Sequence, residues 1–213
     1  MGTARGGGIL SGMTDVAFYF DTWCPWTWVS SRWLVQQAQR QGFTITWRSF
    51  SVAHVNRDRK IPDKDRDHVE AGQRSHRIIQ ALTAKGDNEA IGRFYDAIGN
   101  RKHRQGAPLS AELVTAAAHD AGLDDAAVAA ADDPSWDEAA ARSTDEALAL
   151  AGPDIGSPVL VIDGTGRFGP IIRAVPEPSE GDCLWDAVIA MNEVSVFYEL
   201  KRGRAMGIDL ESS

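Results

Sequence analysis

The segment VAFYFDTWCPWTW, residues 16–28, decides the fold of this chain. Its first half is a short apolar and aromatic run, which predicts a buried strand over residues 15–20. Its second half begins a helix at Pro25, because the first helical turn needs no N–H from that position. Apolar residues then recur with helical spacing up to the stop signal Gly42. We therefore expect a strand that passes almost directly into a helix.

Cys24 lies at the junction of this strand and this helix. Free backbone N–H groups and the positive end of the helix dipole are expected beside its sulfur. Such surroundings favour the thiolate and can lower a cysteine pKa to about 3.5–7.5. A free cysteine is usually a small buried hydrophobe, but the adjoining proline and the flanking tryptophans favour a nucleophile. The pattern therefore predicts that Cys24 is catalytic.

The composition is that of an ordinary globular protein. Of 213 residues, 43% are hydrophobic and 24% are charged, and the formal net charge of -8 disfavours binding to nucleic acid. No apolar run approaches the roughly 20 residues needed to span a bilayer, so we expect no membrane partner. Two cysteines are too few for a disulfide framework and favour a reducing, cytoplasmic location. The glycine-rich residues 1–13 are expected to form a disordered leader.

The remaining periodicity predicts a mixed α/β order. The alternation in residues 43–49 predicts a second strand, parallel to the first through the intervening helix. Residues 51–67 are polar and predict a loop over the site. From residue 64 to 150 no strand pattern appears, and helices are expected over 65–84, 88–99, 110–121, 124–131 and 135–150.

The C-terminal part returns to strands. We expect strands at 158–162 and 167–169, joined by a hairpin turn at 163–166. A helix over 179–192 and a further short helix at 196–202 follow. Residues 205–213 are expected to be a disordered tail.

The quoted segment resembles the active-site entry of the DsbA-like thioredoxin-fold proteins, through Phe20-Asp21-x-x-Cys24-Pro25-Trp26. It is most similar to the mycothiol-dependent nitroreductase branch, whose members carry Cys-Pro-Trp-Cys. The similarity covers roughly residues 14–204, so it is a whole-domain match. Further matching stretches are 31–33, 99–106, 156–158, 168–170, 184–187 and 199–202. This chain departs from the branch at Thr27, where the dithiol relatives have their resolving cysteine.

The resemblance implies a thioredoxin-like α/β fold with an inserted all-helical subdomain. The thioredoxin-like domain would comprise residues 14–63 and 151–204, and the insertion residues 64–150. The resemblance also implies that Pro158 is cis and lies against Cys24, with backbone exposed for a substrate. From the sequence alone, Pro158 is equally an ordinary strand-edge proline, for which a trans bond is the default.

Cys24, Thr27 and Pro158 are the candidate catalytic residues. The Thr27 hydroxyl lies one helical turn from Cys24 and can donate a hydrogen bond to its thiolate, but it cannot form a disulfide. Thr27 can equally be a plain residue of the helix surface. Cys183, the other cysteine, falls within a predicted helix beside Leu184 and Trp185 and is expected to be structural filler.

A second group of residues is expected to bind the substrate or a thiol cofactor. The indoles near Cys24 suit a flat, apolar, conjugated or aromatic small molecule, although indoles at helical spacing also pack in cores. The basic cluster after residue 99 suits a carboxylate or sugar hydroxyls, although it is equally a solvated helix end. His103 in that cluster is also a candidate general acid or base. The expected binding residues are Trp23, Pro25, Trp26, Ser157, Asn100, Arg101 and His103.

Three functions are compatible with these features. The first is a monothiol oxidoreductase that uses a low-molecular-weight thiol, taken from the resemblance to be mycothiol, to reduce a disulfide or a nitro group. The second is an isomerase or thiol S-transferase, in which a thiolate adds reversibly to a conjugated double bond. The third is a binding module without redox competence. Neither a flavin, nicotinamide nor metal site is indicated, because no dinucleotide fingerprint or persuasive metal-ligand spacing is present.

Overall fold

A four-stranded mixed sheet in the order β2-β1-β3-β4 forms the centre of the computed structural model, which describes residues 14–204 and 206–210. β1 (Val16–Phe20) pairs in parallel with β2 (Ile45–Ser49). β3 (Val159–Ile162) runs antiparallel to β1, and β4 (Thr165–Phe168) is antiparallel to β3. α1 (Pro25–Gln41) connects β1 to β2, which confirms the predicted parallel unit.

Helices cover both faces of this sheet. Alternate residues of β1 and β3, such as Phe18 and Leu160, share a buried cluster with α1 and with α8 (Pro178–Asn192). The residues between them, such as Tyr19 and Val161, face the opposite way and join a smaller cluster with α7 (Asp137–Ala151). This alternation follows from the two-residue period of a strand. Because both faces of β3 are buried in this way, its sequence is a continuous apolar run.

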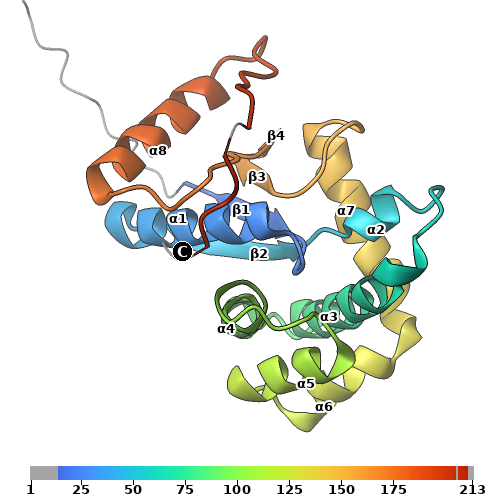
Figure 1. Cartoon of the computed structure of the whole chain (residues 1–213). Coiled ribbons are helices and arrows are strands. Elements are labelled where there is room, and N and C mark those ends of the chain that lie inside the picture. The colour runs from blue at the N-terminus through green and yellow to red at the C-terminus, as the bar shows by residue number, and fades with distance from the viewer. Residues whose placement is uncertain (1–13, 205, 211–213) are drawn as a thin grey trace, which may run out of the picture.

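The helical block between β2 and β3 packs beside β2, away from α8 (Figure 1). Its helices are α2 (Val52–Val55), α3 (Arg66–Ala84), α4 (Asn88–Gly99), α5 (Ala111–Asp120) and α6 (Asp125–Ala129), followed by α7. Short 3-10 turns at 63–65, 130–132 and 134–136 connect them, and a π-helical turn at 100–104 extends α4.

The helical block does not have a core of its own. Tyr95 on α4 stacks on Phe20 of β1 with ring centroids 3.9 Å apart, and its ring also meets Trp47 of β2 at 5.7 Å. Buried residues of α3, α4 and α5 belong to the same apolar cluster as β1 and α1. The division into residues 14–63 with 151–204 and an insertion 64–150 stays a prediction.

Two predicted details near the sheet are wrong. The β3–β4 turn consists of Asp163 and Gly164 alone, not residues 163–166, because both adopt positive φ (49° and 81°) and close a two-residue hairpin. Residues 51–67, predicted as a loop, contain the short helix α2, in which the Ser51 side chain caps the backbone N–H of His54.

The predicted helix at 196–202 is also absent. Arg167 on β4 instead binds backbone carbonyls of this region, donating to Phe197 O at 2.7 Å, Met191 O at 3.0 Å and Val194 O at 3.3 Å. Carbonyls that accept from one guanidinium group hold the chain in an irregular path across the end of α8. We call residues 194–204 the C-terminal strap.

Residues 206–210, part of the predicted tail, pack against the rest of the protein. The backbone N–H of Asp209 donates to Arg173 O at 2.8 Å, and Ile208 and Leu210 pack against the main apolar cluster. The expectation of disorder is therefore wrong for residues 206–210. Residue 205, residues 211–213 and the predicted leader 1–13 lie outside the described residues.

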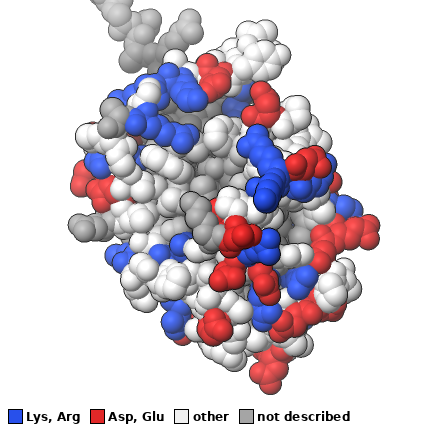
Figure 2. Space-filling model, turned by 45° about the vertical axis from the view of Figure 1, so that its right-hand side comes forward, with Lys and Arg blue, Asp and Glu red and all other residues white. Residues whose placement is uncertain are grey.

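The surface mixes both signs of charge. On the face drawn in Figure 2, acidic and basic side chains intersperse over much of the visible surface, with acidic ones prominent toward the lower right. Within the described part of the chain, no helix has the combination of length and apolarity that crossing a membrane demands.

Gly99 offers a test of how α4 packs on α1. A Cβ added there would lie 2.0 Å from the Trp28 ring, whereas a Cβ at Gly72 in α3 would meet nothing within 4 Å. Gly99→Ala should therefore destabilise the protein by about 1–3 kcal/mol through overpacking, while Gly72→Ala should stabilise it by roughly 0.5–1 kcal/mol through helix propensity. Chemical denaturation measures both, and equal effects of the two substitutions would contradict this packing.

Candidate active site

Cys24 is the N-cap residue of α1, as predicted. Its backbone is extended (φ -79°, ψ 112°), its N–H donates to Asp21 O at 3.3 Å, and its carbonyl accepts from Trp28 N at 3.1 Å. The half-buried Sγ lies 3.9 Å from the carbonyl oxygen of Ser157, within reach of a weak S–H hydrogen bond. The sulfur thus lies between the start of α1 and the loop before β3.

Thr27 and Ser157 join these two segments directly. Their hydroxyl oxygens are 2.7 Å apart, and the Ser157 Oγ also accepts from the backbone N–H of Asp21 at 3.1 Å. Both side chains are buried, so Thr27 is not a surface residue. The Ser157–Pro158 peptide bond is cis, and so is Gly169–Pro170. The structure therefore brings Cys24, Thr27, Ser157 and Pro158 together.

The Cys24 pKa differs from the expectation drawn from the helix terminus. Burial raises the pKa of the Cys24 thiol above its usual value, and the Asp21 carboxylate adds to the rise. Hydrogen bonds from the Thr27 hydroxyl and from the backbone of Thr27 and Trp26 lower the pKa, but they do not outweigh desolvation. The predicted low pKa is therefore wrong, and Cys24 is mainly a thiol at neutral pH.

Asp21 is a site residue that the sequence did not single out. Its buried carboxylate accepts from Trp23 N at 3.3 Å and from Val52 N at 2.7 Å, and it lies 3.8 Å from Nε2 of the buried His76 on α3. A carboxylate at the carboxyl end of a strand, three residues before the cysteine, was the available signal. No sequence pattern indicates His76, which reaches the site only because α3 packs there.

His103 lies beside the site because α4 continues as a π-helical turn. This turn buries His103, whose ring stacks on Trp28 with centroids 5.9 Å apart. Burial and the nearby Lys102 charge lower the pKa of His103 to about 4, although a hydrogen bond to the Thr22 backbone opposes the shift. His103 is thus neutral at physiological pH.

The other residues of the basic cluster make contacts elsewhere. Arg101 pairs with Asp120 on α5 at 2.7 Å, and the Asn100 amide donates to Asp96. The structure does not bring these two side chains into contact with Cys24 or Ser157. Their expected binding role stays a prediction.

The residues flanking Cys24 point in different directions. Trp23 packs against the main apolar cluster, with its ring 6.5 Å from His68 on α3. Pro25 occupies the first position of α1. Trp26 lines a cavity of about 730 Å3 between β3, β4, α8 and the C-terminal strap. Of the two tryptophans expected as pocket walls, Trp26 has the cavity beside it.

Cys183 is far from Cys24. Its neighbour Asp182 on α8 pairs with Arg40 in the last turn of α1, the end opposite Cys24. Gly181, two residues before Cys183, accepts from the indole N–H of Trp33, so this part of α8 lies beside the middle and the end of α1. Cys183 is exposed, so it is not the buried filler that was expected.

Thr27 should set part of the Cys24 pKa. Thr27→Val keeps the shape of the side chain but removes the hydroxyl that lowers this pKa, so the Cys24 pKa should rise further, whereas Thr27→Ser should leave it nearly unchanged. The pH dependence of alkylation by iodoacetamide, measured in a Cys183→Ser background, gives the pKa. A value for Thr27→Val equal to that of the parent would contradict the arrangement.

His103 should make stability depend on pH. Its folded pKa of about 4 lies below the unfolded value of about 6.5, so the unfolded state binds the extra proton and stability falls as pH drops from about 6.5 to 4. The loss should reach about 3 kcal/mol, and His103→Gln should lack it. Urea unfolding at several pH values measures the free energy of unfolding of the wild type and of His103→Gln. The same pH dependence in both proteins would contradict the prediction.

Comparison with known proteins identifies similar chains. This chain is 30% identical over 197 residues to the uncharacterized protein Rv2286c of Mycobacterium tuberculosis, a match that covers 91% of this chain and 84% of that protein. A probable DsbA oxidoreductase from Streptomyces coelicolor superposes with a TM-score of 0.56 at 17% identity, covering 90% of this chain and 94% of the other. A 2-hydroxychromene-2-carboxylate isomerase gives 0.56 at 18% identity, covering 83% and 93%.

At these low identities the solved structures show the fold alone, and they confirm the predicted DsbA-like thioredoxin fold. The sequence family described as Rv2466c-like, mycothiol-dependent nitroreductase Rv2466c, matches residues 23–202. This match confirms the resemblance seen in the sequence and the expectation of a thiol-dependent enzyme. The match spans most of the described residues and includes the Cys24 turn, and the chain therefore belongs to the Rv2466c-like family of mycothiol-dependent nitroreductases.

Proposed function

We propose that this protein is a monothiol enzyme that uses Cys24 and a low-molecular-weight thiol, mycothiol, to reduce a disulfide or a nitro group. The observation that carries the proposal is that one sulfur stands at the start of α1 while Thr27 occupies the position of a second thiol. Because Cys183 lies on α8 beside the middle and the end of α1, away from Cys24, a second thiol has to arrive from solution.

With a disulfide substrate, the chemistry has two exchange steps. The Cys24 sulfur attacks one sulfur of the substrate, the substrate S–S bond breaks, and the other half leaves as a thiolate. The mixed disulfide on Cys24 then exchanges with the small thiol, which restores Cys24. A further small thiol completes the reduction, so two thiols become one disulfide for each substrate bond reduced.

The surroundings of Cys24 support this role despite its raised pKa. The Thr27 hydroxyl and two backbone groups donate to the sulfur and favour the thiolate once it forms. The Ser157 carbonyl lies 3.9 Å from the sulfur on the other side. Because desolvation keeps the resting sulfur protonated, the rate of its reactions should rise with pH through the neutral range.

A polar cavity beside the Ser157 loop suits a polar thiol. It has a volume of about 380 Å3, and Gly156 and Val52 form part of its wall, next to Ser157 and Asp21. Asn56, Arg59 and Asp154 supply polar groups that fit sugar hydroxyls. This cavity, rather than Asn100 and Arg101, is the better candidate for holding mycothiol. The scarcity of cysteine supports a cytoplasmic setting for such chemistry.

Thr27 also favours a second candidate, an isomerase or S-transferase. A lone sulfur with no resolving partner can add to a conjugated carbon and be expelled again without net oxidation. The apolar cavity at Trp26 suits a conjugated substrate for such a reaction. Both proposed reactions would use the same residues. The amount of thiol consumed for each product molecule therefore distinguishes the reductase from the isomerase.

The number of thiols consumed for each substrate molecule reduced tests the proposal. With mycothiol and a small disulfide or nitro-aromatic compound, two thiols should disappear per two-electron reduction, and Cys24→Ser should lower the rate at least 100-fold, while Cys183→Ser should retain it. Product that forms at constant total thiol would instead indicate the isomerase. Equal rates for Cys24→Ser and wild type would exclude both enzymes and leave a binding module.

A further inference from the structure

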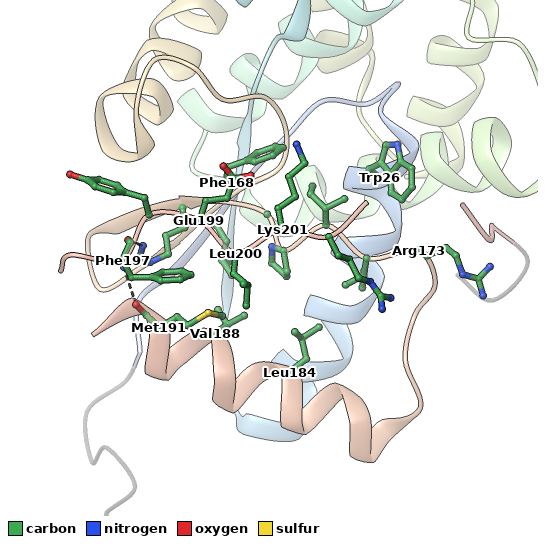
Figure 3. Close-up of a pocket in the computed structure, with 18 of the residues that line it drawn as sticks. Trp26, Phe168, Arg173, Leu184, Val188, Met191, Phe197, Glu199, Leu200 and Lys201 are labelled. Carbon is green, nitrogen blue, oxygen red and sulfur yellow. Dashed lines mark hydrogen bonds between the residues drawn. The ribbon is translucent and has the colours of Figure 1, made fainter. Parts of the chain in front are cut away.

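The cavity at Trp26 is bounded by elements from three parts of the chain. Leu160 of β3 and Leu184 and Val188 of α8 form apolar walls, and the C-terminal strap runs along the open side. Figure 3 shows Leu200 of the strap pointing toward Val188 and Met191 on α8, while Lys201 extends away from α8. Its volume of about 730 Å3 is within the range typical of small-molecule sites.

The strap leaves much of its apolar surface uncovered. Val196, Tyr198 and Leu200 are 82%, 93% and 85% exposed. The strap is nevertheless anchored, because Arg167 binds two of its carbonyls, Phe197 O and Val194 O, and its guanidinium lies 5.5 Å from the Phe197 ring. An apolar segment held beside an apolar cavity but not packed into it leaves room for a ligand between them.

The cavity is rimmed by cations in a chain whose net charge is -8. Besides Arg167, which binds backbone carbonyls, the described lining has four cations, Arg173, Lys201, Arg202 and Arg204, and one acid, Glu199. Among the described residues, none of these four cations forms a salt bridge with a carboxylate. Arg204 lies 4.8 Å from the Trp26 ring, which brings one of these charges to the residue two positions from Cys24. A cationic rim around an apolar cavity is complementary to an organic anion.

We propose that this cavity binds a small organic anion with a flat apolar body, and that the anion is the substrate class presented to Cys24. The apolar body would lie between α8 and the strap, and the anionic group would lie among Arg173 and Arg204. The presentation to Cys24 rests on the proposed function, whereas binding in the cavity does not. A concave cavity of this size, with walls from β3, α8 and the strap, suits a small molecule better than a second protein.

Two fluorescent probes test the binding. 8-Anilinonaphthalene-1-sulfonate carries an anionic group on an aromatic body, and N-phenyl-1-naphthylamine is its uncharged counterpart. The sulfonate should bind one site saturably, and its affinity should fall as salt is raised. Arg173→Gln combined with Arg204→Gln should weaken the sulfonate at least fivefold and the uncharged probe less than twofold. Arg142→Gln, an exposed arginine of α7 outside the cavity, is the matched control and should change neither.

The cavity itself is tested by filling it. Leu184→Trp should weaken both probes, and Leu200→Trp, at an exposed position that folding does not depend on, provides a second variant. Absence of saturable sulfonate binding, equal loss of both probes in the arginine variant, or a dimer that buries the strap and excludes the probe would overturn the proposal.

A separate experiment tests whether the bound anion lies next to Cys24. In Cys183→Ser protein, the bound sulfonate should slow alkylation of Cys24 by iodoacetamide at least threefold. Unchanged alkylation would overturn the assignment of the anion to Cys24. Protection of Cys24 together with turnover that Cys24→Ser does not affect would instead refute the proposed function and leave the binding site standing.

Discussion

The hydrogen bond between Thr27 and Ser157 is the contact on which the site depends. It joins the first turn of α1 to the loop that enters β3, two segments separated by the whole helical block. Ser157 also accepts from the N–H of Asp21, so the end of β1 is fixed by the same hydroxyl. The position of the Cys24 sulfur follows from these contacts, since β1, α1 and the β3 loop meet around it.

The same contacts explain the protonation of the sulfur. A helix terminus open to water favours a thiolate, but here buried neighbours remove water from the sulfur and a carboxylate lies nearby. Sequence position indicates the dipole and says nothing about the degree of burial. The direction of the Cys24 pKa shift therefore depends on the packing around the sulfur, which the local sequence does not specify.

Features of the fold that depend on local sequence were predictable, whereas features that depend on contacts between distant segments were not. The strands, the long helices and the Cys24 junction follow from local periodicity and from Pro25 and Gly42, which act within a few residues. The π-helical turn at His103, the approach of His76 and the path of the strap depend on contacts between distant segments. Arg101 shows the limit most clearly, because its basic neighbourhood suggested a ligand site while its actual partner is Asp120.

The stacking of Tyr95 on Phe20 has a consequence for how the molecule comes apart. Because a ring of the helical block is 3.9 Å from a ring of the central strand, the two parts share hydrophobic contacts that neither retains alone. Heating should then melt the helices and the sheet in one calorimetric peak, and neither part should survive when expressed as a fragment. The sheet and the helices between β2 and β3 should therefore behave as one cooperative unit.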